Sequence, residues 1–393
     1  MECIRCGNKD PSLFYKTQRG YYCRCCIRFS RLLIEEDEEP FNYKLSNKEV
    51  NLKLKYELTK YQKEAANKTL DLLKKGQDTV LYCVTGAGKT EIASIAINDF
   101  LKRNKKVCYA IPRREVVIEL EERFRRMFKG IDIVAVYGGH HQKLVADLVL
   151  CTTHQLYRYP KTFDLLVIDE ADAYPLKGDQ VLINISKHAA KGVILYSTAT
   201  LDDELKEKIA NKELQKVFLP LRPHLKPLIE PKFIYEPYLV MLLHIYKIIK
   251  RQNNPLIIFV PRKKDAERLY KLYKNFFDIT YAYSDLKERE INIELFKKGQ
   301  KKIIIATSLL ERGITVNDTD VLILVIVDNI FDESSLIQMC GRAGRNFHNP
   351  KGQVTIISNF INKIYVSDDG SIDIMLKYDS QYENAIKALN YAK

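Results

Sequence analysis

Short apolar runs alternate with amphipathic helical stretches from about Tyr56 onward. The apolar runs predict buried strands at Thr79–Val84, Val107–Ile111, Ile133–Val136, Leu148–Cys151, Leu165–Asp169 and Gly192–Ser197, and again at Leu256–Val260, Ile279–Tyr283, Lys302–Thr307, Val321–Val327 and Gly352–Ser358. Such runs are apolar at almost every position, which is typical of a parallel sheet that helices cover on both faces. The pattern therefore predicts an α/β protein built from two successive sets of βαβ units.

The domain boundaries follow from changes along this pattern. A chain of 393 residues has room for two large domains and a smaller element. Four prolines within residues 220–231 interrupt both helix and strand and predict a hinge. We expect a cysteine-rich head at 1–34, an acidic linker at 35–55, a first domain at 56–221, the hinge at 222–232 and a second domain at 233–393. The run Glu35–Glu39 is predicted to be solvated, and Ser380–Lys393 to be a terminal helix.

The charge balance favours a polyanionic partner. Lys and Arg exceed Asp and Glu by 63 − 50 = 13, and a surplus of this size is typical of nucleic-acid binding, although a generally Lys-rich proteome would produce it too. The longest apolar run, Val321–Val327, is too short to cross a bilayer, and the polar segment Met1–Phe14 does not fit a signal peptide. We therefore expect a cytoplasmic protein that would need a partner to associate with a membrane.

Five of the nine cysteines lie within the first 26 residues. Cys3, Cys6, Cys23 and Cys26 follow the spacing C-x₂-C-x₁₆-C-x₂-C, which is typical of a structural zinc site closed by four thiolates. Cys25 could replace Cys26 if the loop bends differently, and a redox pair or free thiols would be the alternative to metal. Because so short a head has almost no hydrophobic core, we expect Zn²⁺ to stabilise its fold.

Basic and aromatic residues alternate in the head. The set comprises Arg5, Lys16, Arg19, Arg24, Arg28 and Arg31 together with Tyr15, Tyr21 and Tyr22. This composition suits contact with single-stranded DNA, where bases stack on aromatic rings. It would equally suit docking of a protein partner, and the sequence leaves both open.

A phosphate-binding loop is predicted between a strand and a helix. The segment Cys83–Thr90 reads CVTGAGKT, which follows an apolar strand and precedes the helical stretch 91–101. Glycines let successive backbone N–H groups turn toward phosphate oxygens, and the helix N-terminus adds partial positive charge. The predicted ATP-binding residues are Thr85, Gly86, Ala87, Gly88, Lys89 and Thr90. Lys89 would reach the β- and γ-phosphates, and the Thr90 hydroxyl would bind Mg²⁺.

A second acidic element ends another predicted strand. In the segment Leu165–Asp172, Asp169 stands at the strand's carboxyl end, where open α/β sheets bind ligands. We expect Asp169 to hold Mg²⁺ through water and Glu170 to polarise the attacking water. A solvated acidic turn is the alternative, which the presence of Lys89 disfavours.

The order of the motifs resembles that of superfamily 2 helicases of the DEAD type. Residues 169–172 spell DEAD, 197–200 (STAT) resemble motif III, and 338–345 (QMCGRAGR) resemble motif VI. Residues 58–62, 111–114, 152–156, 258–261 and 307–315 are similar to motifs Q, Ia, Ic, IV and V. Cys83 replaces the usual first glycine of the phosphate loop. The resemblance implies two RecA-like parallel-sheet domains in tandem, following the small N-terminal zinc element.

The resemblance also implies a role for each matching residue. Gln62 and Gly313 would contact the nucleotide. Coupling of the nucleotide state to nucleic-acid binding would come from Ser197, Thr198, Thr200 and Gln338. Arg342 and Arg345 would act as arginine fingers, which contribute about 10³–10⁵ in rate where measured. Sequence-independent contacts with phosphate and sugar would come from Arg113, Thr153, Gln155, Arg262 and Thr307.

The zinc head joined to one helicase core, with LLERGIT and DEADAYP in its motifs, resembles the ComFA family of late-competence motors. That resemblance implies an ATPase that is stimulated by single-stranded DNA and pulls transforming DNA into the cytoplasm. The implied partners are a ComFC-like phosphoribosyltransferase-fold protein, the membrane DNA channel protein and single-strand-loading factors, with a position at the inner face of the membrane and a possible oligomer.

Three alternatives remain at this stage. A PriA-like replication-restart or other DNA repair helicase would carry its zinc knuckles between motifs of the second domain. A DEAD-type RNA helicase would carry PTRELA in motif Ia and HRxGR in motif VI, which this chain lacks. A non-catalytic nucleic-acid clamp would not need the intact residues Lys89, Asp169 and Glu170.

Overall fold

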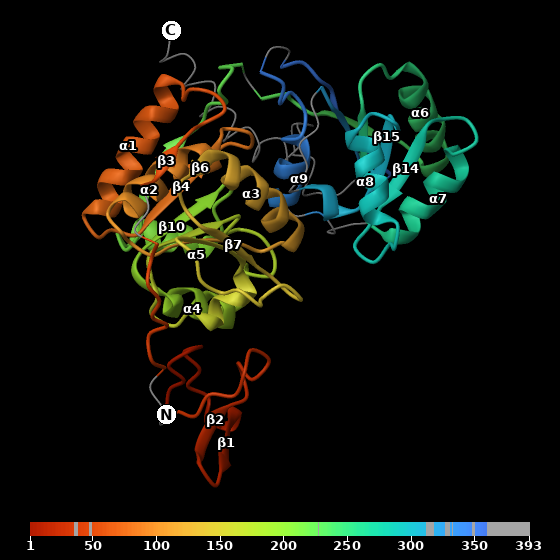
Figure 1. Cartoon of the computed structure of the whole chain (residues 1–393). Helices are drawn as coiled ribbons and strands as arrows, with labels where there is room; N and C mark the ends of the chain where they lie inside the picture. Colours follow the sequence, from red (N-terminus) through yellow and green to blue (C-terminus); the bar gives the residue numbers. More distant parts are fainter. Residues whose placement is uncertain are drawn as a thin grey trace. The chain divides into compact units, whose positions relative to one another are not determined.

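A computed structural model of the chain describes residues 1–34, 38–46, 49–226, 228–311, 318–326, 331, 333–347 and 350–359. It divides into two compact units, of which the first comprises 1–83 and 88–219 and the second comprises 84–87 and the residues from 220 onward (Figure 1). The predicted helix Ser380–Lys393 and the predicted nucleotide contact Gly313 lie outside the described residues.

The first unit is built on a parallel sheet in the order β11-β4-β10-β9-β5-β8-β7. Its strands are β4 (Thr79–Cys83), β5 (Val107–Ile111), β7 (Ile133–Val136), β8 (Leu148–Thr152), β9 (Phe163–Asp169), β10 (Ala190–Thr198) and β11 (Gln215–Leu219). The six strands predicted for this domain are confirmed with small shifts of their ends. The edge strand β11 was not predicted, because exposed and buried residues alternate along it and it has no continuous apolar run.

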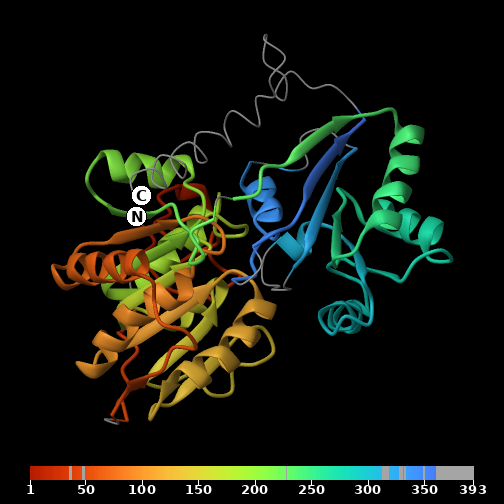
Figure 2. The ribbon, with the colours of Figure 1, turned by 90° about the horizontal axis from the view of Figure 1, so that it is seen from above.

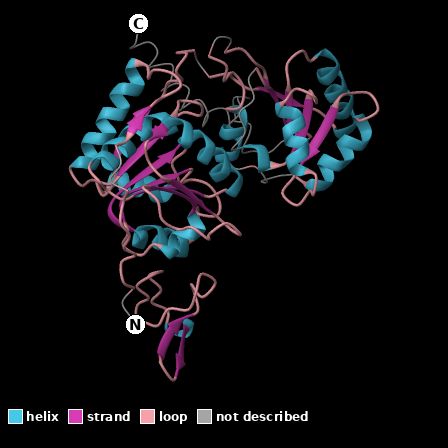
Figure 3. Ribbon diagram, in the orientation of Figure 1, coloured by secondary structure: helices cyan, strands magenta, loops and turns pink. Residues whose placement is uncertain are grey.

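Helices flank this sheet (Figure 3). They are α1 (Lys60–Lys74), α2 (Lys89–Lys102), α3 (Arg114–Met127), α4 (Gln180–Ala189) and α5 (Asp203–Ala210), with the 3₁₀ segment η2 (Thr153–Arg158) after β8. Helix α1 shows how sequence sets a boundary: Thr59 and Gln62 form a capping box at its start. It then buries Ala65, Ala66, Thr69 and Leu73, which share one face at helical spacing.

The second unit contains another parallel sheet, in the order β12-β17-β16-β13-β15-β14. Its strands are β12 (Lys232–Tyr235), β13 (Leu256–Phe259), β14 (Ile279–Ala282), β15 (Ile303–Ala306), β16 (Asp320–Val325) and β17 (Val354–Ser358). The five predicted strands are confirmed. The edge strand β12 was missed, and it places Lys232, the last residue of the predicted hinge, within the second sheet.

Helices cover both faces of the second sheet (Figure 2). The helices α6 (Tyr238–Arg251) and α7 (Lys263–Tyr273) pack on one face through Met241, Ile245 and Leu269. The helices α8 (Arg289–Lys297) and α9 (Glu333–Cys340) pack on the other face through Phe296 and Leu336. Each unit is therefore a sheet covered on both sides, as the apolar strands predicted.

The segment predicted as an acidic linker lies along the first domain. The Phe41 amide donates to the Pro160 carbonyl at 3.1 Å, and the Ser46 amide donates to Asp147 Oδ1 at 2.7 Å. Farther along, the short strand β3 (Asn51–Leu52) pairs antiparallel with β6 (Phe128–Lys129). The described part of the predicted acidic linker 35–55 is therefore packed along the first domain.

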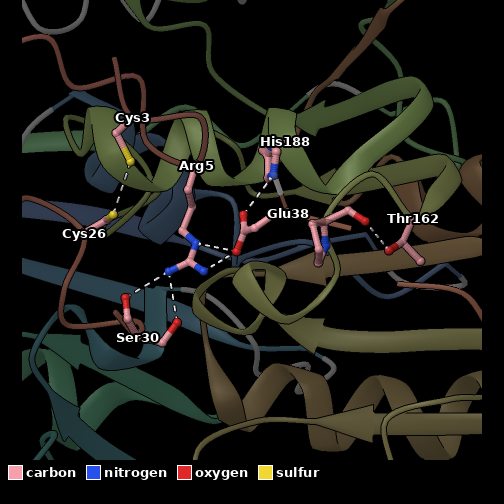
Figure 4. A network of polar contacts seen from close by, with 8 residues as sticks. Cys3, Arg5, Cys26, Ser30, Glu38, Thr162 and His188 are labelled. Atoms are coloured by element: carbon pink, nitrogen blue, oxygen red, sulfur yellow. Dashed lines mark hydrogen bonds and ion pairs between the residues drawn. The ribbon is translucent and has the colours of Figure 1, made fainter. Parts of the chain in front are cut away.

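Glu38 contradicts the predicted solvation of the acidic run most directly (Figure 4). Its side chain is only 10% exposed and forms an ion pair with Arg5, which is 5% exposed. His188, at the end of α4, lies 3.0 Å from the other carboxylate oxygen of Glu38. Burial would raise the pKa of Glu38, but hydrogen bonds from His188 and Arg5 outweigh it and lower that pKa. One carboxylate thus joins the head to the first domain.

Replacing Glu38 should loosen the head selectively. Glu38→Ala leaves the buried Arg5 guanidinium without this carboxylate, and removing one member of a buried pair costs about 3–5 kcal/mol. We expect faster hydrogen exchange at the amides of residues 1–34, with the rest of the first unit little changed. The neighbouring exposed Glu39→Ala is the matched control. Equal exchange in the two variants would contradict the bridging role of Glu38.

Candidate functional site

Three predicted motifs meet at one edge of the first sheet. Strand β10 lies between β4 and β9, with Ser197 paired to Asp169 and Thr198 paired to Tyr82. Because all three strands are parallel, their carboxyl ends share one edge, where α/β folds bind ligands. The phosphate loop follows β4, the DEAD sequence begins at the end of β9, and the STAT sequence begins within the last residues of β10.

The phosphate loop has the backbone that its glycines were predicted to allow. Gly86 and Gly88 have φ values of +79° and +83°, in the left-handed region that favours glycine. Gly88 is also the N-cap of α2, which starts at Lys89 and has no side-chain cap. The amides of that first turn are the kind of donor that binds phosphate at a helix N-terminus. Thr85, Ala87 and Thr90 are buried around this turn.

Gln62 lies beside the phosphate loop. A Cβ added to Gly88 would come within 2.6 Å of Gln62 Nε2, so the end of the Gln62 side chain lies directly against this glycine. The other end of the same amide is engaged locally, because Gln62 Oε1 accepts from the Thr59 amide at 2.9 Å. The structure therefore shows a helix-capping role for Gln62, and its predicted contact with adenine stays a prediction.

Cys83, which replaces the usual first glycine, is a fully buried strand residue. Burial raises the pKa of Cys83 to about 12, and the neighbouring Lys89 only partly opposes this shift. The thiol is therefore neutral at physiological pH, and we assign it a packing role. The departure from the family pattern leaves the turn at Gly86 and Gly88 intact.

Asp169 is held in place by a residue that the sequence analysis did not single out. The Tyr109 hydroxyl, on β5, donates to Asp169 Oδ2 at 2.6 Å, and the Glu170 amide donates to Asp169 Oδ1 at 3.0 Å. Burial and the adjacent Asp169 carboxylate raise the pKa of Tyr109 well above its usual value, so the phenol keeps its proton. The available signal was a tyrosine within a wholly buried strand, whose hydroxyl needs a partner.

Glu170 adopts an unusual backbone conformation. Its φ is +54°, a region that residues with a side chain occupy rarely and at a cost of about 1–3 kcal/mol. Such strain is found most often at functional sites, where the surrounding structure fixes the conformation. This geometry agrees with the predicted role of Glu170 at the reacting end of the nucleotide, which stays a prediction.

Motifs II and III are joined by a buried network. Asp172 accepts hydrogen bonds from the hydroxyls of Thr198 and Thr200, each at 2.5 Å. Thr198 Oγ1 also lies 2.7 Å from the Thr200 carbonyl oxygen. Ser197, one position earlier, is fully buried within β10. The sequence reasoning placed Thr198 and Thr200 in coupling, and the structure connects both to the last carboxylate of DEAD.

The five predicted nucleic-acid contacts lie in segments that follow strands of the two sheets. Arg113 and Arg262 are the N-caps of α3 and α7, and Thr307 follows β15. Gln155, in η2, accepts a hydrogen bond from Arg158 at 2.7 Å. Thr153 differs, because its side chain is 0% exposed and its hydroxyl is not accessible in this conformation. These contacts stay predictions, with Thr153 the least supported of them.

In the second unit, motif VI continues from α9. Gln338 and Arg342 are buried, and Arg345 is half-buried with its Nε donating to the Gly341 carbonyl at 2.8 Å. Gln338 therefore lies in the last turn of α9, Arg342 in the turn that follows, and Arg345 directly after that turn. Their predicted roles toward the nucleotide are not tested by this geometry.

The four cysteines predicted as metal ligands come together in the head. Their sulfur atoms all lie within 4.8 Å of one another, and the pairs Cys3–Cys26 and Cys6–Cys23 are separated by 3.7 Å. A tetrahedral zinc site with Zn–S bonds of about 2.3 Å has sulfurs about 3.8 Å apart, which fits these pairs. Cys25 lies outside the cluster and is only half-buried. The geometry therefore selects Cys26 as the fourth candidate ligand.

The cysteine cluster is held against the first domain. Asn184 of α4 donates to the Cys6 carbonyl at 2.7 Å, and Arg28 forms an ion pair with Asp179 at the start of that helix. Phe29 packs on His154 and Tyr157 of η2, with ring centroids 6.2 and 5.6 Å apart. The head is therefore attached beside the segment that carries Gln155.

Comparison with known proteins is consistent with these motifs. Residues 59–208 match the family model described as DEAD/DEAH box helicase, and residues 239–347 match that of the helicase conserved C-terminal domain. The competence protein ComFA of Bacillus subtilis (strain 168) is 34% identical over 374 residues, covering 90% of this chain and 80% of that protein. The competence protein ComFA of Streptococcus pneumoniae is 32% identical over 375 residues, covering 92% and 87%.

A solved structure shows the same fold. S. cerevisiae Dbp5 bound to RNA and ADP BeF3 superposes with a TM-score of 0.60 and covers 85% of this chain and 87% of that chain. Its sequence identity is 20%, so the similarity concerns the arrangement of the two helicase domains' elements.

Proposed function

The chain belongs to the ComFA family of competence proteins, and on that premise we propose that it is an ATP-dependent translocase that draws transforming single-stranded DNA into the cytoplasm. The two helicase domains make it an ATP-hydrolysing helicase. The observation that carries the proposal is the joint placement of motifs I, II and III at one edge of the first sheet. The movement on single-stranded DNA and the uptake role are the parts that we propose.

The same edge supplies the groups that ATP hydrolysis needs. We propose that the loop 85–88 and Lys89 bind the phosphates, while Thr90 and Asp169 hold Mg²⁺, with Tyr109 fixing the orientation of the Asp169 carboxylate. Mg²⁺, when bound, neutralises charge on the phosphates. Glu170 would then orient the attacking water. The motif spelling supports Arg342 and Arg345 as the residues that stabilise the transition state.

Charge and motif type support movement along a nucleic acid, and the competence family supports DNA as that nucleic acid. A surplus of 13 positive charges favours a polyanion, and backbone contacts without base contacts permit movement along any sequence. We propose Arg113, Gln155, Arg262 and Thr307 as such contacts. We propose that the network of Asp172 with Thr198 and Thr200 couples the state of the bound nucleotide to the strength of these nucleic-acid contacts. Ser197 and Gln338 would contribute to the same coupling.

Membrane attachment would come through partners. Within the part of the chain that the structure describes, no helix is long and apolar enough to span a bilayer. We propose that the motor works at the inner face of the membrane with a channel protein and a ComFC-like partner. The family of the chain supports this placement, and binding assays with those proteins would test it.

Steady-state ATP hydrolysis tests the proposed activity. We expect single-stranded DNA to stimulate the wild type more than duplex DNA or RNA does. Glu170→Gln should lower the stimulated rate by about 10²-fold or more, because it removes the candidate base, and Lys89→Ala should abolish turnover. The matched control is Glu122→Gln, on the exposed face of α3. Stimulation by RNA instead would assign the protein to RNA remodelling.

The cysteine cluster is proposed to hold Zn²⁺ as a structural ion. Four buried thiolates would close the coordination shell and leave no position for substrate, so the ion would stabilise the head. The isolated head has little other core, which makes its fold depend on metal. The second unit has its own cores and should not need the ion. The cysteines share a core cluster with the first sheet, whose long apolar strands should keep that sheet folded without the ion.

Metal analysis of two cysteine variants tests this assignment. The wild type should carry about one zinc per chain, and Cys3→Ala should lose it while retaining ATP hydrolysis. Cys25→Ala should keep the zinc, since Cys25 lies outside the cluster. Zinc retained in Cys3→Ala, or lost equally in Cys25→Ala, would contradict the ligand set.

A further inference from the structure

The head carries a hairpin whose two faces differ in chemistry. Strands β1 (Phe14–Thr17) and β2 (Gly20–Cys23) pair antiparallel, with Phe14 opposite Cys23 and Tyr15 opposite Tyr22. Side chains alternate between the faces of a strand, so Phe14 and Cys23 share one face and Tyr15 and Tyr22 the other. The first face holds a metal-ligand cysteine and packs on the protein core. The second face is not needed for that packing.

Aromatic and cationic groups gather on the second face. Tyr15 is 54% exposed, and its ring lies 5.5 Å from that of Tyr22. The Arg31 guanidinium lies over the Tyr22 ring at 4.9 Å from its centroid. Tyr22 is half-buried, so the pair presents one exposed ring and one ring that carries a guanidinium, a composition on which nucleic-acid bases stack.

The charge of the head is complementary to a polyanion. Residues 1–34 contain seven Lys or Arg and two Asp or Glu. Arg5 and Arg28 are engaged by Glu38 and Asp179 in holding the head to the first domain. The cations of the hairpin and its surroundings are exposed and comprise Lys16, Arg19, Arg24 and Arg31. The exposed charge of the hairpin is therefore positive, with Arg31 beside the tyrosine pair and Lys16 over Tyr21 on the opposite face.

We propose that Tyr15, Tyr22 and Arg31 form a stacking site for single-stranded DNA that is separate from the two helicase domains. This inference rests on the proposed function for the identity of the nucleic acid. Rings accept any base, so the site would bind without regard to sequence, as a translocase requires. Leu33 also lies beside Tyr22, but the charged residues around the hairpin are cations, which favour a polyanion over an apolar protein surface.

The site has a fixed position relative to the first domain. Phe29 contacts η2, and Arg28 contacts Asp179 at the start of α4. Glu38 joins Arg5 to His188 (Figure 4). Segment η2 carries Gln155, one of the proposed contacts of the helicase core. The hairpin therefore adds binding length to the first domain, and a long strand can contact both sites where a short strand contacts one.

Binding of two lengths of oligothymidylate to the full-length, zinc-loaded protein tests the proposal. We expect Tyr15→Ala and Tyr22→Ala each to weaken binding of a strand of about 30 nucleotides, roughly 5- to 150-fold, as loss of one stacked base does. Binding of a strand of about 8 nucleotides should change little, since one module of this kind occupies about 4–16 nucleotides. Fluorescence anisotropy without nucleotide measures both affinities.

The controls separate this inference from the proposed function and from misfolding. Tyr15→Phe should retain affinity because the ring remains, and Tyr235→Ala removes a similarly exposed tyrosine from β12. Zinc content confirms that the head of each variant is folded. If Tyr22→Ala loses zinc, the affinities of Tyr15→Ala and of the exposed Arg31→Glu test the site in its place. If zinc-loaded Tyr15→Ala binds the long strand as tightly as the wild type does, the proposed DNA site is wrong. The exposed tyrosine would then be assigned to docking of a protein. ATP hydrolysis at saturating long DNA should persist in these variants, whereas its absence in the wild type would instead contradict the proposed function.

Discussion

Backbone pairing of β10 between β4 and β9 is the constraint on which the candidate site depends. It fixes three strand ends in register, so that the phosphate loop, the DEAD carboxylates and the STAT hydroxyls arrive at one edge although they are far apart in sequence. No single side chain achieves this. Tyr109 and Asp172 then act within that frame, the first by fixing Asp169 and the second by tying motif II to Thr198 and Thr200.

The central strands could be predicted from sequence because they are buried on both faces and carry continuous apolar runs. The edge strands β11 and β12 could not, because each is partly exposed and its pattern resembles that of a loop. The phosphate loop and the cysteine cluster were also predictable, since their chemistry requires particular residues at short spacing. In the cysteine cluster, only the structure distinguished Cys26 from Cys25.

Contacts between distant residues escaped the sequence analysis. Glu38 was predicted to be solvated because its neighbours are acidic, yet its partners Arg5 and His188 lie 33 and 150 positions away, as 38 − 5 and 188 − 38. Tyr109 is 60 positions from Asp169 and gave no local pattern beyond a polar hydroxyl in an apolar strand. The contacts of Glu38, with those of Arg28 and Cys6 to α4, make the cysteine-rich head a part of the first unit, whereas the sequence predicted a separate head on a linker.

Displacement of streptavidin from biotinylated single-stranded DNA measures movement along the strand directly. We expect ATP-dependent displacement from one end of the strand and not from the other, with none for Glu170→Gln. ATP hydrolysis stimulated by DNA but without displacement from either end would contradict translocation and would identify the protein as a DNA-responsive ATPase that does not move along DNA.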